Sequence, residues 1–164
     1  MAKFQSVDEL VETTRPINPV YCIREDSIET SAAWFKNNFP GNILYAVKAN
    51  PNEKVLKTLL KNNITDFDTA TIEEIRLIKK IAPQAKAYFM HTIKSKESVS
   101  EAYFKYNVKD FSLDSKDELD KILKATNQAK DLTLYLRIQT SNEHAEIDLS
   151  KKFGATVYES SSLL

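Results

Sequence analysis

Residues 43–50 read Ile-Leu-Tyr-Ala-Val-Lys-Ala-Asn, a nearly continuous apolar run that ends in a lysine and an asparagine. Such a run is typical of a short strand that is buried on both faces, as in a parallel sheet. The segment therefore predicts a buried strand, with Lys48 just beyond its carboxyl end.

Strand-like and helical patterns alternate outward from this segment. Four further strands are predicted at residues 66–68, 87–90, 110–113 and 132–138. Helical spacing of apolar residues predicts helices at residues 53–61, from residue 72 to just before Pro83, and at residues 96–106 and 115–126. Thr71 with Glu74 and Ser115 with Glu118 match capping boxes. Five strands with four intervening helices predict an α/β fold with a parallel sheet.

A polar residue follows each apolar strand core. These residues are separated by 20, 23, 23 and 23 positions, and they are Lys48, Asp68, His91, Asp114 and Arg137. In a (β/α)8 barrel the carboxyl ends of the strands converge on one face, whereas a doubly wound sheet spreads them along a crevice. The even period, without a Gly-x-Gly-x-x-Gly turn, favours the barrel.

The chain is shorter than a complete barrel of this type. A full barrel takes about 250 residues, and the 164 residues supply five strands, so we expect a partial (β/α)8 barrel that stops before closure. We divide the chain into residues 1–26, an N-terminal extension with one strand at residues 20–23, and residues 27–164, the barrel part. A helix over residues 27–39 leads into the first barrel strand.

Composition excludes several classes of function. Lysine plus arginine equals aspartate plus glutamate at 23 each, so there is no basic excess for nucleic acid. No signal peptide and no membrane span are recognised, and we expect a cytoplasmic protein. Cys22, flanked by apolar residues, is expected to be a buried thiol. Neither His91 nor His144 belongs to a metal-like cluster, so no metal site is proposed.

Lys48 has two interpretations from its position alone. A partly buried lysine has a lowered pKa, which makes its amine nucleophilic enough to form a Schiff base. Alternatively, the side chain simply leaves the edge of the sheet into solvent. Position alone leaves both open.

The wider sequence resembles the fold-type-III, pyridoxal-phosphate-dependent decarboxylases of ornithine, lysine and diaminopimelate. The similarity is carried by five blocks in order, at residues 45–51, 67–75, 111–119, 136–138 and 152–155. The family usually has cysteine or valine at Thr69 and serine at Thr71. His91 also departs from the Gly-Asn-Thr-Ile-Lys pattern of many bacterial relatives, and we assign it no catalytic role.

The resemblance implies a role for several residues. It makes Lys48 the catalytic residue that binds pyridoxal 5'-phosphate as a Schiff base, and it places Asp68, Glu74 and Arg137 around the cofactor. Plainer interpretations are a strand-end turn for Asp68 and a helix cap for Glu74. Arg137 needs a carboxylate or phosphate if it is buried. The resemblance puts Lys152 near a subunit interface; a solvated loop lysine is the alternative.

The family's remaining parts have no counterpart in the 164 residues. They include the glycine-rich phosphate loop, which a chain with two glycines cannot supply. The others are the histidine stacked on the cofactor, the glutamate on its ring nitrogen, the C-terminal β-domain and the partner subunit's cysteine and aspartate. We therefore expect the chain alone to be inactive.

The resemblance implies a homodimeric enzyme that decarboxylates a small basic amino acid, with ornithine to putrescine in polyamine biosynthesis as the default. Two alternatives are a non-catalytic relative that pairs with an intact decarboxylase, and another pyridoxal-phosphate barrel such as an alanine racemase.

Overall fold

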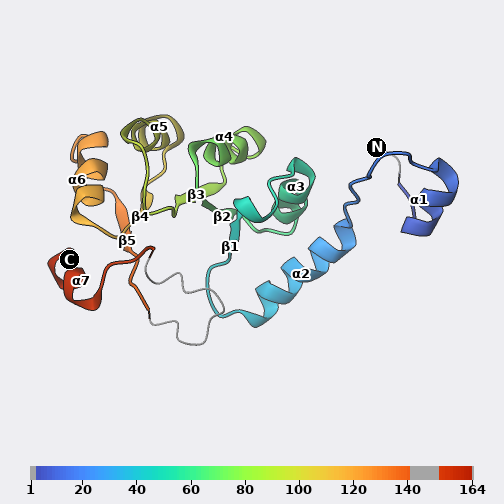
Figure 1. The fold of residues 1–164 in the computed structure, drawn as a ribbon, viewed down its shortest axis with the longest axis horizontal. Coiled ribbons are helices and arrows are strands. Elements are labelled where there is room, and N and C mark those ends of the chain that lie inside the picture. Colours follow the sequence, from blue (N-terminus) through green and yellow to red (C-terminus); the bar gives the residue numbers. More distant parts are fainter. Residues whose placement is uncertain (1–2, 141–151, 164) are drawn as a thin grey trace.

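The computed structural model describes residues 3–140 and 152–163, and its centre is one parallel five-stranded sheet (Figure 1). The strands lie in sequence order, each hydrogen-bonded to the next. They are β1 (Leu44–Ala46), β2 (Asp66–Thr69), β3 (Lys86–Phe89), β4 (Asp110–Leu113) and β5 (Thr133–Leu136). All five predicted barrel strands are confirmed, with shorter bounds at both ends of the sheet.

A helix follows each of the first four strands, as the apolar spacing predicts. These helices are α3 (Glu53–Lys61), α4 (Ile72–Ile81), α5 (Lys96–Tyr106) and α6 (Lys116–Ala125). They form an arc over one face of the strands (Figure 1). A strand–helix order in which every strand is parallel to its neighbour is the architecture of a partial (β/α) barrel.

Each of these helices begins at a side-chain cap. The caps are Asn52, Thr71, Ser95 and Ser115, whose side chains accept hydrogen bonds from backbone N–H groups in the first turn. Both predicted capping positions, Thr71 and Ser115, are confirmed. Caps satisfy N–H groups that have no partner within the helix, and so fix where each helix starts.

The hydrophobic core lies between the sheet and the helices. Phe67, Phe89 and Phe111 come from three adjacent strands and are almost completely buried. Phe89 and Phe111 pack with residues of α4, α5 and α6, whereas Phe67 packs with residues of α3 and α4. Burying a side chain of this size stabilises the fold by about 1.5–3 kcal/mol.

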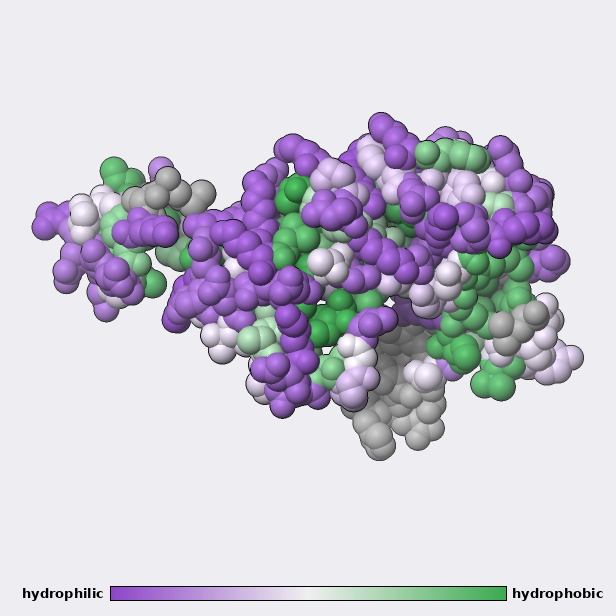
Figure 2. All heavy atoms as spheres, turned by 180° about the vertical axis from the view of Figure 1, so that it is seen from behind, coloured by the Kyte–Doolittle hydropathy of each residue, from purple (hydrophilic) through white to green (hydrophobic). Residues whose placement is uncertain are grey.

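The opposite face of the sheet carries polar side chains near the amino ends of the strands. Tyr88 donates a hydrogen bond to Asp66 at 3.0 Å, Tyr135 donates one to Asp110 at 3.0 Å, and Lys86 forms an ion pair with Asp110. From behind, the surface is mainly hydrophilic, with apolar patches below the helices and towards the end with β5 and α7 (Val157–Leu163) (Figure 2).

The N-terminal extension differs from its prediction. Residues 20–23 form no strand, and Cys22 is exposed rather than buried. Instead, the helix α1 (Val7–Thr14) occupies this part of the chain and has no buried residue. No described strand lies beside residues 20–23, and a strand requires a hydrogen-bonded neighbour, so the apolar composition alone was misleading.

The helix α2 (Glu25–Asn38) leads into β1, close to the predicted bounds. Its Ala32 joins Val55 and Leu59 of α3 in a small apolar cluster, which fixes α2 against the first βα unit. Among the described residues, no helix combines the length and apolar composition needed to cross a bilayer.

Candidate active site

The five predicted strand-end residues lie at one edge of the sheet. Asp68 is within β2, Asp114 and Arg137 come directly after β4 and β5, and Lys48 and His91 come two residues after β1 and β3. Because all strands are parallel, their carboxyl ends share this edge. The side-by-side arrangement is confirmed, but each residue has its own surroundings.

Lys48 lies in a short 3-10 helix, η1 (Val47–Ala49), and its side chain is exposed. Of the two interpretations of its position, the exposed side chain is the one seen in the part of the chain described. Val47, the preceding residue, is fully buried against the core and fixes the turn from below. The alternation of a buried valine and an exposed lysine points the amine away from the core.

Asp68 is the charged neighbour of Lys48. It is half-buried, and this burial raises the pKa of its carboxyl group, while the positive charge of Lys48 acts in the opposite direction. Burial is the larger of the two causes, so the carboxyl group holds its proton more tightly than a solvated aspartate does. Lys48 and Asp68 are thus brought together, as the sequence predicts.

The turn after Lys48 is fixed by hydrogen bonds to Asn50. Its side-chain oxygen accepts from the backbone N–H of Asn52 at 3.1 Å, and its side-chain NH2 donates to the hydroxyl of Tyr21 at 2.8 Å. Tyr21 belongs to the N-terminal extension. The extension therefore reaches the Lys48 turn, a contact for which the sequence holds no recognisable signal.

Glu74 acts as a helix cap in this structure. Its carboxylate accepts a hydrogen bond from the backbone N–H of Ala70 at 2.7 Å, while its own N–H donates to the hydroxyl of Thr71 at 3.2 Å. The bond to Thr71 is the one expected of a capping box, whereas the carboxylate reaches the residue before the cap, Ala70, instead of Thr71 itself. Glu74 lies at the same edge as Lys48, but its contacts are those of the plainer interpretation.

Arg137 is exposed and stacks on an aromatic ring. Its guanidinium carbon lies 5.0 Å from the centre of the Phe153 ring, and the Lys152 ammonium lies 5.3 Å from the same ring. His91 meets Phe153 edge-to-face at 5.6 Å. Such cation–ring contacts are worth about 0.5–1 kcal/mol when exposed, so they orient Arg137 without occupying its donors.

The Phe153 loop is attached to the end of β4. The backbone N–H of Gly154 donates to the Asp114 carboxylate at 2.9 Å, and Ala155 exchanges backbone hydrogen bonds with Arg137 and Gln139. Gly154 has φ of 102°, and a Cβ there would lie 2.7 Å from the backbone nitrogen of Gln139. Only glycine fits this position without strain.

Arg137 remains distant from Lys48 along the sheet. β1 and β5 are separated by three strands, which is roughly 19 Å at the usual strand spacing. The structure therefore joins Lys48 with Asp68 at one end, and Arg137 with His91 and Phe153 at the other. His144 lies outside the described residues.

Lys94 is the residue that sequence reasoning missed. Its side chain is completely buried, and its ammonium contacts two backbone carbonyls and the Glu118 carboxylate. Burial lowers the pKa of Lys94, and Glu118 opposes this. Apart from a lysine in a loop and a glutamate at a helix start, the sequence offers no signal, because the pairing joins residues 24 positions apart.

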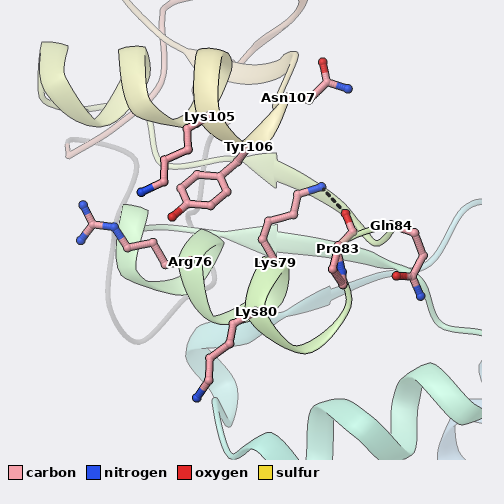
Figure 3. Close-up of a pocket in the computed structure, with 8 residues that line it drawn as sticks. All are labelled: Arg76, Lys79, Lys80, Pro83, Gln84, Lys105, Tyr106 and Asn107. Atoms are coloured by element: carbon pink, nitrogen blue, oxygen red, sulfur yellow. Dashed lines mark hydrogen bonds between the residues drawn. The ribbon is translucent and has the colours of Figure 1, made fainter.

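A cavity lies elsewhere, beside the carboxyl-terminal ends of α4 and α5. It measures about 590 Å³ and is lined by Arg76, Lys79, Lys80, Pro83, Gln84, Lys105, Tyr106 and Asn107 (Figure 3). Lys79 donates to the carbonyl of Pro83, and Arg76 is paired with Glu101. The cavity is remote from Lys48, and helix carboxyl ends disfavour anions, so it is not the candidate active site.

Comparisons with known proteins agree on one family. Residues 25–164 match the family described as "Pyridoxal-dependent decarboxylase, pyridoxal binding domain". The chain is 30% identical over 168 residues to the lysine/ornithine decarboxylase of Selenomonas ruminantium, covering 100% of this chain and 42% of that protein. It is 32% identical to the ornithine decarboxylase of Mus pahari, covering 85% of this chain and 29% of that protein.

A solved structure agrees in fold. The arginine decarboxylase of Paramecium bursaria Chlorella virus, bound to agmatine, superposes with a TM-score of 0.83 at 29% identity, covering 93% of this chain and 41% of that one. The chain thus spans less than half the length of each of these three proteins.

Proposed function

The chain belongs to the pyridoxal-dependent decarboxylase family, and from this premise we propose that it supplies the first half of the cofactor barrel of an enzyme that decarboxylates a basic amino acid. The observation that carries the proposal is Lys48, an exposed amine beside a half-buried carboxyl group at the carboxyl edge of a parallel sheet. Sites of (β/α) barrels are built at this edge.

The residues present fit one end of pyridoxal 5'-phosphate. The amine of Lys48 is accessible to the cofactor aldehyde, and Asp68 places a proton-binding group next to it. A cradle for the phosphate group requires several backbone N–H groups in a glycine-rich turn. The chain has only Gly41 and Gly154, so it supplies the covalent anchor without that cradle.

The protein's part in the reaction follows from these positions. When bound, the cofactor supplies an electron sink for the pair that remains when a carboxylate leaves as carbon dioxide. Lys48 would anchor the cofactor through its amine, and the carboxyl group of Asp68, whose pKa is raised by burial, lies beside that amine. Arg137 offers planar donors suited to a carboxylate or phosphate. Glu74 fixes the turn after β2 and thereby the position of Asp68.

Ornithine is the substrate that we propose, with putrescine as product and polyamine biosynthesis as the setting. Two relatives are named for ornithine, one of them also for lysine, and the viral structure for arginine; all three are basic amino acids. We also propose a homodimer for the complete enzyme and a cytoplasmic location.

Reduction with borohydride tests the anchor directly. The purified chain is incubated with pyridoxal phosphate, reduced, digested and mapped by mass spectrometry. We expect labelling at Lys48 and loss of that label in Lys48→Arg, with Lys54→Arg as the matched control. Labelling spread evenly over surface lysines would contradict a specific anchor.

Release of carbon dioxide tests the activity. The chain alone is expected to release none from ornithine, lysine or arginine, because it lacks the phosphate cradle. Rapid release by the chain alone would show that the expectation of inactivity is wrong.

A further inference from the structure

The ammonium of Lys94 is enclosed by three acceptors. It lies 2.8 Å from the carbonyl oxygen of His91, 2.6 Å from that of Ser112 and 2.9 Å from a carboxylate oxygen of Glu118. The side chain of Lys94 is 0% exposed and that of Glu118 is 4% exposed. The ammonium donates two hydrogen bonds and forms one ion pair, and its burial leaves no access for a reactant.

A buried ion pair of this kind is weak as a source of stability. Removing two charges from water costs several kcal/mol per ion in effect, and replacing a buried pair by apolar residues of similar volume is often neutral or stabilising. Removing only one partner is costly, because the other charge stays buried. The pair is therefore better explained by what it holds in place.

The two carbonyls belong to adjacent strand ends. His91 follows β3, and Ser112 lies within β4, two residues before Asp114. Glu118 belongs to the first turn of α6, whose cap, Ser115, directly follows Asp114. The Lys94 ammonium thus ties together the loop that carries His91, the end of β4 and the start of α6.

Asp114 connects the end of β4 to the loop that carries Phe153 and Gly154. Its carboxylate accepts from Gly154, which sets the Phe153 ring between His91 and Arg137. A continuous set of contacts therefore runs from Lys94 to the guanidinium that we assign to the cofactor or substrate.

We propose that Lys94 and Glu118 are positioning residues, which hold the His91 and Asp114 loops so that Phe153 and Arg137 are assembled at the carboxyl edge. The consequence for the cofactor rests on the proposed function, whereas the positioning itself does not.

The test compares single and double variants of the full chain. Lys94→Met and Glu118→Met each leave one buried charge, and the double variant leaves none. We expect the singles to lose stability and the double variant to recover it in urea unfolding. If the pair has only a structural role, the Gly154 amide of the double variant should also regain its protection from hydrogen exchange. Positioning predicts that Gly154 still exchanges about tenfold faster in the double variant, the factor for a lost hydrogen bond of ordinary strength.

Two controls keep the result decisive. Lys116→Met removes an exposed lysine of α6, which pairs with Asp120 and not with Glu118, and it should leave Gly154 exchange unchanged. If the double variant does not fold, Lys94→Arg serves instead. A guanidinium keeps the charge but cannot match both carbonyls, so Gly154 exchange should accelerate.

Gly154 exchange at the wild-type rate in the folded double variant, or in folded Lys94→Arg, overturns the proposal. Amide exchange needs no cofactor. Failure of borohydride labelling at Lys48 in the wild-type chain would instead count against the proposed function alone, so the two failures are distinguishable.

Discussion

Lys48 and Lys94 follow two strands of the same sheet at the same edge, yet their surroundings are opposite. Lys48 follows β1, which lies at the side of the sheet, and its amine is exposed. Lys94 follows β3, which lies between two other strands, and its side chain is fully buried against α6. A place beyond a strand therefore does not determine burial. The loop that follows, and the helix that covers it, do.

The largest expected effect is the difference in the free energy of unfolding between a variant of Lys94 and a variant of Lys48. Lys94→Met leaves the buried Glu118 carboxylate with Lys121 as its remaining partner, so it should lower the free energy of unfolding by about 3 kcal/mol, the lower end for a broken buried pair. Lys48→Met alters an exposed side chain and should change it by less than about 0.5 kcal/mol. Urea unfolding followed by circular dichroism measures both. Equal losses would remove the contrast.

The second prediction concerns the Gly154 loop, where the close backbone contacts indicate that a Cβ would destabilise the fold. Gly154→Ala forces a Cβ against the backbone of residues 138 and 139 at positive φ, and should cost about 1–3 kcal/mol. Gly41→Ala is the matched control, since the atoms nearest to its Cβ would be those of the Phe39 ring, which can rotate away. If both variants unfold at the same urea concentration, the close approach at Gly154 is without consequence.

Glu74 and Glu118 occupy equivalent places, three residues after the helix caps Thr71 and Ser115, and only Glu118 is in a buried pair. Glu74→Ala should cost about 1 kcal/mol, because one backbone N–H loses its cap. The neighbouring Glu73→Ala, which loses an exposed ion pair with Arg76, should cost about 0.3 kcal/mol. Thermal unfolding resolves the order. If Glu74→Ala left the stability unchanged, Glu74 would not be explained as a helix cap, and its place beside the cofactor would remain as its role.

The smallest effect concerns the charge beside Lys48. The pKa of Asp68 is raised in the folded chain, so ionisation of this group disfavours the folded state. The penalty is fully present above the folded-state pKa and disappears as the pH falls below the unfolded value of about 3.9. Asp68→Asn should therefore stabilise the chain slightly at pH 8 and have no effect near pH 3. A gain that grows as the pH falls would reverse the sign.

Much of the fold was predictable from local patterns. Apolar runs such as residues 43–47 and 110–113 located the strands, and Thr71 and Ser115 located two helix starts, because strand burial and helix capping are set by neighbouring residues. The even spacing of strand-end residues predicted one shared edge. The strand expected at residues 20–23 failed, because a strand also needs a neighbour, which composition cannot supply.

The sequence by itself determined the βα order, the shared edge and the place of Lys48 and Asp68 on it. Only the tertiary structure decided which lysine is buried and that Arg137 stacks on Phe153. Each of these depends on a contact between segments distant in sequence, such as Lys94 with Glu118 or Asp114 with Gly154. Periodicity reports which face of an element is apolar, but the partner of a buried charge is fixed only when the elements pack.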